Sequence, residues 1–318
     1  VKLRRKITYT FVIYKTFPYF LLKMEEKSYL CSSLNRLIMA TISEIRDRLA
    51  VLRQEMETRQ LSAFIVPSTD PHSGEYVPEH WETRKWTTGF TGSAGTAVIA
   101  LSDAGLWTDS RYFIQAEEQL EGTGIRLFKD RLPETPSIAE WLGSILHEGD
   151  KVGIDGWGNS HQEASGLKKD LKAKGLTLET MTEDIFDTLW KDRPTLPQTP
   201  VFILDEGRTG ASCTEKLNRI RESIAKNGAS AIILSALDEI AWTLNLRGDD
   251  VHCNPVFISY LLISKEGYTL YILEDKITDE VRTYLKAHQV EIKTYSRLAE
   301  DIKAFKEKHQ GNLQKTRL

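Results

Sequence analysis

Ser62-Ala-Phe-Ile-Val66 and Ser230-Ala-Ile-Ile-Leu234 are two versions of one short apolar sequence, and they begin 168 residues apart. An apolar run of this length is typical of a buried β-strand. An amphipathic stretch with helical spacing precedes each run, which predicts a helix packed on a sheet. The stripe before the first run is Ile45, Leu49, Leu52 and Met56, with Thr41 or Ser43 as its expected cap, and the stripe before the second is Leu217, Ile220 and Ile224.

Two further pairs of segments follow in the same order. Trp86-Thr-Thr-Gly-Phe-Thr-Gly92 returns as Trp242-Thr-Leu-Asn-Leu-Arg-Gly248, 156 residues later. Leu101-Ser-Asp-Ala-Gly105 returns as Ile263-Ser-Lys-Glu-Gly267, 162 residues later. Three pairs in one order, with gaps of a few residues in loops, indicate a duplicated unit. Since strands alternate with helices in both copies, the predicted fold class is α/β, with two tandem domains that each pack helices on a mixed β-sheet.

A proline-rich segment predicts where one copy gives way to the next. Arg193-Pro-Thr-Leu-Pro-Gln-Thr-Pro200 places three prolines in eight residues, and proline removes backbone donors and stiffens the chain. We therefore expect one domain over residues 39–194, a second over 195–309, and a tail at 310–318. Residues 1–38, a basic start joined to an aromatic stretch, are interpreted as an extension ahead of Met39 and outside the fold.

Composition narrows the possible partners. The 318 residues are 41% hydrophobic and 27% charged, which is enough apolar material for two cores. A net charge of -3, with acids and bases interleaved, argues against a nucleic-acid partner. Lys15 and Pro18 interrupt the apolar N-terminal run, so no membrane span is expected. Cys31, Cys213 and Cys253 match neither a zinc site nor a disulfide framework, which indicates reduced thiols in a cytoplasmic protein.

The glycine-rich segment Gly89-Phe-Thr-Gly-Ser-Ala-Gly95 has two possible roles. Its backbone amides could hold a phosphate, as glycine-rich loops do elsewhere. However, its spacing fits no phosphate-binding motif, and it leads into a strand rather than a helix. A tight structural turn is therefore the favoured interpretation.

Two polar clusters are candidate sites. In Trp107-Thr-Asp-Ser-Arg-Tyr-Phe113, a strand end would present Asp109, Arg111 and Tyr112 to a ligand, although an Asp109–Arg111 pair could equally be structural. In the second cluster, the adjacent Asp249 and Asp250 would point in different directions on an extended segment, and no further ligand completes a metal shell. A structural network of arginine and aspartate is therefore favoured there over a metal site. The second cluster consists of Arg247, Asp249, Asp250 and His252.

These segments together resemble a known family. Ser-Ala-Gly-Thr-Ala-Val from Ser93, Leu-Trp-Thr-Asp-Ser-Arg-Tyr-Phe at 106–113, and Ala-Leu-Asp-Glu-Ile-Ala-Trp with Asn-Leu-Arg-Gly-Asp-Asp-Val at 236–251 are similar to the long, three-domain aminopeptidase P, or Xaa-Pro aminopeptidase. Asn254-Pro-Val-Phe extends the likeness, which covers about residues 41–309. The resemblance implies two creatinase-like N-terminal domains ahead of a pita-bread domain that removes a residue preceding proline.

The same resemblance sets the expectations for cofactor and site. The family's chemistry uses two divalent metal ions, expected to be manganese, held by two Asp, one His and two Glu of the pita-bread domain. None of these ligands maps onto this sequence, so we expect no metal or catalytic residue in it. It is interpreted as a non-catalytic N-terminal portion that is inactive alone, whose partners are the missing pita-bread domain, proline-containing peptides and, in the full-length enzyme, a second subunit. Arg111, with Asp109 and Tyr112, is the expected substrate contact.

Two other functions remain open from the sequence. The chain could be a stand-alone binding or regulatory module that pairs with a separate catalytic chain. It could also be an independent enzyme that uses His252 with Asp249 or Asp250, which the directions of the two aspartates disfavour.

Overall fold

The computed structural model describes the backbone of residues 24–309 and the side chains of residues 41–308. Most of the expected extension and all of the expected tail lie outside these ranges. Helix α1 (Met24–Thr58) spans the division at Ser43 between two compact units of the chain. Because the helix begins at Met24, neither Thr41 nor Ser43 caps its start, and that prediction was wrong. The unit Glu44–Leu318 contains every sheet of the described residues.

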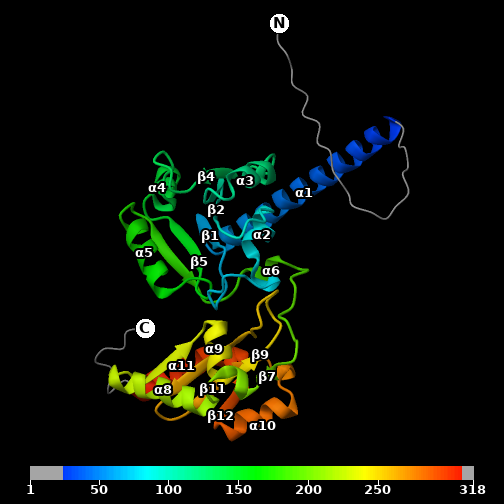
Figure 1. Cartoon of the computed structure of the whole chain (residues 1–318). Coiled ribbons are helices and arrows are strands. Elements are labelled where there is room, and N and C mark those ends of the chain that lie inside the picture. Colours follow the sequence, from blue (N-terminus) through cyan, green and yellow to red (C-terminus); the bar gives the residue numbers. More distant parts are fainter. Residues whose placement is uncertain (1–23, 310–318) are drawn as a thin grey trace. The chain divides into compact units, whose positions relative to one another are not determined.

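The first module, from α1 to α6, is built on a six-stranded mixed sheet. Its strand order is β4-β3-β2-β1-β5-β6. β1, β2 and β3 pair antiparallel, whereas the pairs β3–β4, β1–β5 and β5–β6 are parallel, and Figure 1 shows β5 beside β1 despite their separation in the chain. The strands are β1 (Ala63–Pro67), β2 (Thr96–Ala100), β3 (Ala104–Thr108), β4 (Arg126–Lys129), β5 (Lys151–Asp155) and β6 (Thr177–Met181).

Helices cover both faces of this sheet because successive strand residues point to opposite sides. On one face, Phe64 and Val66 pack with the stripe of α1, with α3 and with α6. On the other face, Ile65 packs with α4 and α5. Ser137 and Ser160 form capping boxes at the starts of α4 and α5, as the sequence predicted for Ser160. The helices are α2 (Thr83–Thr88), α3 (Phe113–Leu120), α4 (Ile138–Ile145), α5 (His161–Lys172), α6 (Phe186–Leu189) and the short η1 (Glu79–Trp81).

The second module, from β7 to α11, repeats the first part of this plan. Its main sheet has the order β12-β11-β10-β8, and a separate pair joins β7 to β9. The strands are β7 (Phe202–Ile203), β8 (Ala231–Leu234), β9 (Leu246–Arg247), β10 (Ser259–Ser264), β11 (Tyr268–Ile272) and β12 (Val290–Thr294). The helices are α7 (Glu206–Thr209), α8 (Cys213–Lys226), α9 (Leu237–Leu244), α10 (Asp279–Ala287), α11 (Leu298–His309), and the short η2 (Glu274–Lys276) and η3 (Tyr295–Arg297).

The two modules correspond element by element. β8, β10 and β11 pair antiparallel and β12 joins β11 in parallel, as β1, β2, β3 and β4 do in the first module. Two of the predicted segment pairs keep their offsets. β1 matches β8, and Gly89 matches Asn245. Gly89 and Asn245 each end a helix with a positive φ. These correspondences confirm a fold of two tandem mixed sheets packed with helices.

The third segment pair needs a correction of two residues. The hairpin closes with Ile99 opposite Ala104 in the first module and with Ile263 opposite Tyr268 in the second. Ile99 therefore corresponds to Ile263, an offset of 164 rather than 162. The sequence comparison aligned Gly105 with Gly267, but Gly105 lies in β3 and Gly267 lies in the turn between β10 and β11. A shift of two residues keeps every side chain on its face of a strand, so the apolar pattern could not reveal the error.

A cation and a tryptophan also recur between the modules. Arg48 of α1 donates to the carbonyl oxygen of Trp86 over 3.1 Å, and its guanidinium lies 5.4 Å from that indole ring. At the matching positions, Lys216 of α8 donates to the carbonyl oxygen of Trp242 over 2.8 Å, and its ammonium lies 4.3 Å from that ring. Because such paired contacts require the same placement of helix and tryptophan, they tie α1 and α2 to α8 and α9 as equivalent elements.

Candidate functional site

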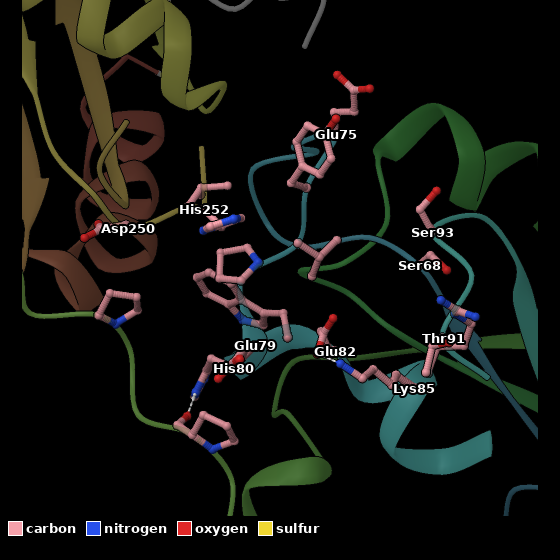
Figure 2. Close-up of a pocket in the computed structure, with 18 of the residues that line it drawn as sticks. Ser68, Glu75, Glu79, His80, Glu82, Lys85, Thr91, Ser93, Asp250 and His252 are labelled. Carbon is pink, nitrogen blue, oxygen red and sulfur yellow. Dashed lines mark hydrogen bonds and ion pairs between the residues drawn. The ribbon is translucent and has the colours of Figure 1, made fainter. Parts of the chain in front are cut away.

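A cavity of about 820 Å³ is the candidate site of this chain. Its lining comes from loops of the first module, from the proline-rich linker and from the polar turn of the second module. Figure 2 shows the acids, histidines and hydroxyl groups around it. The residues labelled there are Ser68, Glu75, Glu79, His80, Glu82, Lys85, Thr91, Ser93, Asp250 and His252.

The linker wall of the cavity is held by Arg193. Its guanidinium is almost fully buried, donates to the carbonyl oxygen of His80 over 2.7 Å, and forms ion pairs with Asp184 and Asp187. His80 Nδ1 lies 2.7 Å from the carbonyl oxygen of Pro194, so that ring nitrogen is the donor (Figure 2). Burial lowers the pKa of His80, which keeps its other nitrogen available as an acceptor. Arg193 and Pro194 of the linker are thus both hydrogen-bonded to His80 of η1.

The glycine-rich segment is a tightly held turn on the cavity wall. Arg84 is buried, and it donates to the carbonyl oxygens of Phe90, at 3.3 Å, and Gly92. A Cβ at Gly92 would lie 2.4 Å from the ring of Phe90 and 2.8 Å from that of Tyr112, so the position requires glycine. Two backbone N–H groups of the segment are also taken up within the protein, that of Phe90 by Thr88 Oγ1 at 3.1 Å and that of Thr91 by Gln119 Oε1 at 2.9 Å. These contacts favour the structural turn that the sequence indicated.

The Asp109 to Tyr112 turn stands next to this wall. Arg111 is paired bidentately with Asp109, Nε to Oδ1 at 2.9 Å and Nη2 to Oδ2 at 2.8 Å. The side-chain hydrogen bond from Arg111 lowers the pKa of Asp109 to about 2. The hydroxyl group of Tyr112 lies 2.6 Å from that of Ser93, a cavity residue. The three predicted residues therefore contact one another, and Tyr112 links them to the cavity rim.

The ion pair between Asp109 and Arg111 has the geometry of a structural contact, and it still leaves Arg111 able to bind a ligand. The side chain of Arg111 remains 65% exposed. The guanidinium of Arg111 has five N–H donors, and two of them bond to Asp109. Three donors therefore remain for another acceptor. Helix α3 begins at Phe113, and ahead of it the carboxylate of Asp109 accepts a hydrogen bond from the backbone N–H of Arg111.

The second polar cluster differs from its prediction. Arg247 does not pair with the aspartates: it donates to the carbonyl oxygens of Ala241, at 2.7 Å, and Leu246, at 2.8 Å. Asp250 instead forms a fully buried ion pair with Lys276 of η2 and accepts from the backbone N–H of Ile258. A structural ion pair is present, but the prediction that arginine is its cation was wrong, because Lys276 takes that place. Lys276 lies 26 residues further along the chain, too far for spacing alone to associate the two.

The carboxylate of Asp250 is engaged entirely by groups of the protein. Both oxygens of Asp250 are occupied, Oδ2 by Lys276 and Ile258 and Oδ1 by the hydroxyl group of Thr199 at 2.8 Å. Asp249, next to Asp250 in the sequence, is exposed. Over residues 41–308, no group of three or more His, Cys, Asp or Glu side chains could hold a metal ion.

Sequence reasoning missed the longest part of the cavity wall. Residues 75–85 contribute most of its acids and both Arg84 and Lys85, and Glu82 pairs with Lys85 at 2.6 Å (Figure 2). The signal was the mixture of Pro78, an aromatic residue and charges between two apolar strands, which is the composition of a functional loop. The segment has no counterpart in any catalytic or metal motif, so composition alone could not assign it a role.

A buried histidine next to this loop was also missed. His72 is 1% exposed. Its Nδ1 donates to the carbonyl oxygen of Ser235 over 3.0 Å, and its Nε2 accepts from the hydroxyl group of Tyr295 at 2.9 Å. Burial lowers the pKa of His72 to about 4, so the ring is neutral near pH 7. Its partners come from the second module, a relation that no local pattern indicates.

No helix in the described part of the chain is both long enough and apolar enough to cross a membrane.

Comparisons with protein families match both halves of the chain. Models described as the creatinase/prolidase N-terminal domain match residues 48–186 and residues 192–317. The chain is 43% identical over 261 residues to a protein named probable Xaa-Pro aminopeptidase P from Sordaria macrospora, and 36% identical over 283 residues to Xaa-Pro aminopeptidase 2 from Homo sapiens. These alignments cover 81% and 86% of this chain but 42% of each relative.

One solved structure resembles the chain over most of its length. It is the X-prolyl aminopeptidase of Caenorhabditis elegans, described as a cytosolic enzyme with a di-nuclear active site. The TM-score is 0.79 at 30% identity, over 84% of this chain and 45% of that one. The chain therefore spans less than half the length of the relatives that it matches.

Proposed function

Because the chain belongs to the creatinase/prolidase N-terminal domain family in both of its halves, we propose that it is the non-catalytic N-terminal portion of an Xaa-Pro aminopeptidase. The observation that carries this proposal is the likeness to Xaa-Pro aminopeptidases over more than four fifths of this chain, a span that takes in both modules. In such an enzyme the bond between an N-terminal residue and a following proline is hydrolysed. The domain limits we propose are 39–194 and 195–309, with the linker held by Arg193 at their junction.

The chemistry of the proposed enzyme depends on polypeptide outside these two modules. A di-nuclear metal site would polarise the scissile carbonyl and activate water. The described residues do not fit such a site, because they contain no group of three metal-binding side chains. We propose two manganese ions for the full-length enzyme, proline-containing peptides as its substrates, a homodimer as its assembly and the cytoplasm as its location.

Within this chain, we propose that Arg111 contacts the peptide substrate. Its exposed guanidinium retains three free donors, and Asp109 and Tyr112 hold its orientation. A guanidinium held in this way can bind a carboxylate or a carbonyl oxygen without first losing the freedom of its own side chain. Asp109 and Tyr112 are then positioning residues for Arg111.

The test is a fusion of this chain to the polypeptide that follows the matched region in the Sordaria relative. We expect Arg111→Ala to raise KM for an Xaa-Pro peptide about tenfold. Arg126→Ala is the matched control, since Arg126 is exposed on the same sheet and paired with Asp103. Unchanged KM and kcat in Arg111→Ala would show that Arg111 has no such role.

The alternative is a stand-alone binding module that pairs with a separate catalytic chain. The cavity favours it, because walls from both modules already enclose a site within this chain. A fusion that folds but never cleaves an Xaa-Pro peptide, while the chain binds a separate peptidase, would support this alternative.

A further inference from the structure

An apolar groove lies on the second module beside β8. It is formed mainly by side chains of α8, β8 and α9, with Asp238 and Glu239 near its end. β8 is the last strand of its sheet, so one of its edges has no partner strand among the described residues. Two large apolar side chains in the groove are exposed, Ile232 by 40% and Trp242 by 47%. Besides the small Ala231, six apolar residues line it, namely Ile220, Ile224, Ala229, Ile232, Leu234 and Trp242.

Every one of these lining residues has a counterpart in the first module. The offset of 168 residues relates the α8 and β8 positions to α1 and β1, and the offset of 156 relates Trp242 to Trp86. All six counterparts belong to one buried core of the first module. They are Leu52, Met56, Leu61, Phe64, Val66 and Trp86. The groove is thus equivalent to a buried core surface of the first module, but among the described residues no segment packs against it.

The first module shows what that cover is. β5 pairs in parallel with the outer edge of β1, and the backbone of Gly153 lies directly against Phe64. Phe186 of α6 meets Phe64 edge-on at 6.4 Å, and Trp190 stacks on Trp86 at 5.7 Å. Under this cover, Phe64 is 1% exposed and Trp86 is 8% exposed.

On the helix side, the two tryptophans have equivalent neighbours. Arg48 lies over Trp86 as Lys216 lies over Trp242, and each cation donates to the carbonyl oxygen of its tryptophan. The helix side of the groove is therefore complete. What remains open is the side that β5 and α6 cover in the first module.

We propose that the groove is the docking surface for polypeptide of the same protein beyond residue 318, which adds a parallel strand to β8 and lays an aromatic side chain on Trp242. The order of elements indicates this source. α11 follows β12 as α4 follows β4, and the element that comes after α4 is β5. The inference rests on the proposed function, because it takes the additional polypeptide from the longer protein.

The test compares thiol labelling in two proteins, the 318-residue chain and the fusion to the following polypeptide of the Sordaria relative. Ile232→Cys places a thiol in the groove, and Leu101→Cys places a matched thiol in the β2–β3 turn, where Leu101 is also 40% exposed. Maleimide labelling is followed by mass spectrometry of the peptide that contains the new cysteine. We expect labelling at position 232 to slow by at least about tenfold in the fusion, since covered sites react only on local opening, with no change at position 101.

Equal labelling of position 232 in both proteins would overturn the inference. So would labelling in the 318-residue chain that slows as its concentration rises, because a second copy would then cover the groove. Cleavage of an Xaa-Pro peptide by the fusion separates this result from the proposed function. An active fusion with an unprotected position 232 refutes the inference alone, whereas protection without activity refutes only the proposed function.

Discussion

The carboxylate of Asp109 and the guanidinium of Arg111 are close enough to set each other's properties. Two charge-assisted hydrogen bonds hold the carboxylate, and they lower its pKa although the pair lies at the surface. In Arg111→Ala, we expect the pKa of Asp109 to rise from about 2 toward about 4, the ordinary value of an aspartate. Carboxyl ¹³C chemical shifts followed against pH measure this change. A pKa that stays near 2 in the variant would mean that Arg111 is not its cause.

His72 gives the fold a dependence on pH. Burial lowers its pKa to about 4, against an ordinary value of about 6.5, so the unfolded chain binds a proton there that the folded chain does not. Stability therefore rises with pH between about 4 and about 6.5, by up to roughly 3 kcal/mol over that window. Urea unfolding at pH 7 and pH 5 should show a smaller loss for His72→Phe than for the unchanged chain. Equal losses would assign the dependence to other groups.

Asp250 and Lys276 connect two elements and the linker. The pair is fully buried, and Asp250 also holds Thr199 and the start of the segment that leads to β10. We expect Asp250→Asn or Lys276→Met to lower the free energy of unfolding by about 3–5 kcal/mol, because each leaves a buried charge unpaired. The double variant should lose less than the sum of the two. Additive losses, measured by chemical denaturation, would contradict a direct pairing.

At the scale of elements, local patterns predicted the strands and helices well and their partners poorly. The stripe at Ile45, Leu49, Leu52 and Met56 is buried as its spacing requires. The apolar run from Ser62, which was predicted to be a strand, likewise forms β1 at Ala63–Pro67. Both the stripe and this strand depend on the pattern along a single element. The cation of Asp250 and the partners of His72 depend instead on chain segments 26 and more than 160 residues away. Single-sequence spacing carries no information about such contacts.

At the scale of the molecule, the internal duplication predicted the two-module fold correctly but one strand register incorrectly. Repeated strands and the pair Gly89 and Asn245 establish the equivalence of the modules. The predicted hairpin register was wrong by two residues because Gly105, a strand residue, was matched with Gly267. The cavity could not be predicted, since its walls come from five separate segments of the chain. The residues at 109–112 were found because a strand end and its motif coincide there.

The most direct test of the proposed function is cleavage of an Xaa-Pro peptide in the presence of manganese. The purified 318-residue chain, shown by circular dichroism to be folded, should release no N-terminal residue, whereas its fusion to the following polypeptide of the Sordaria relative should release it in a manganese-dependent way. Release by the 318-residue chain alone would contradict the assignment of these two modules as a non-catalytic portion.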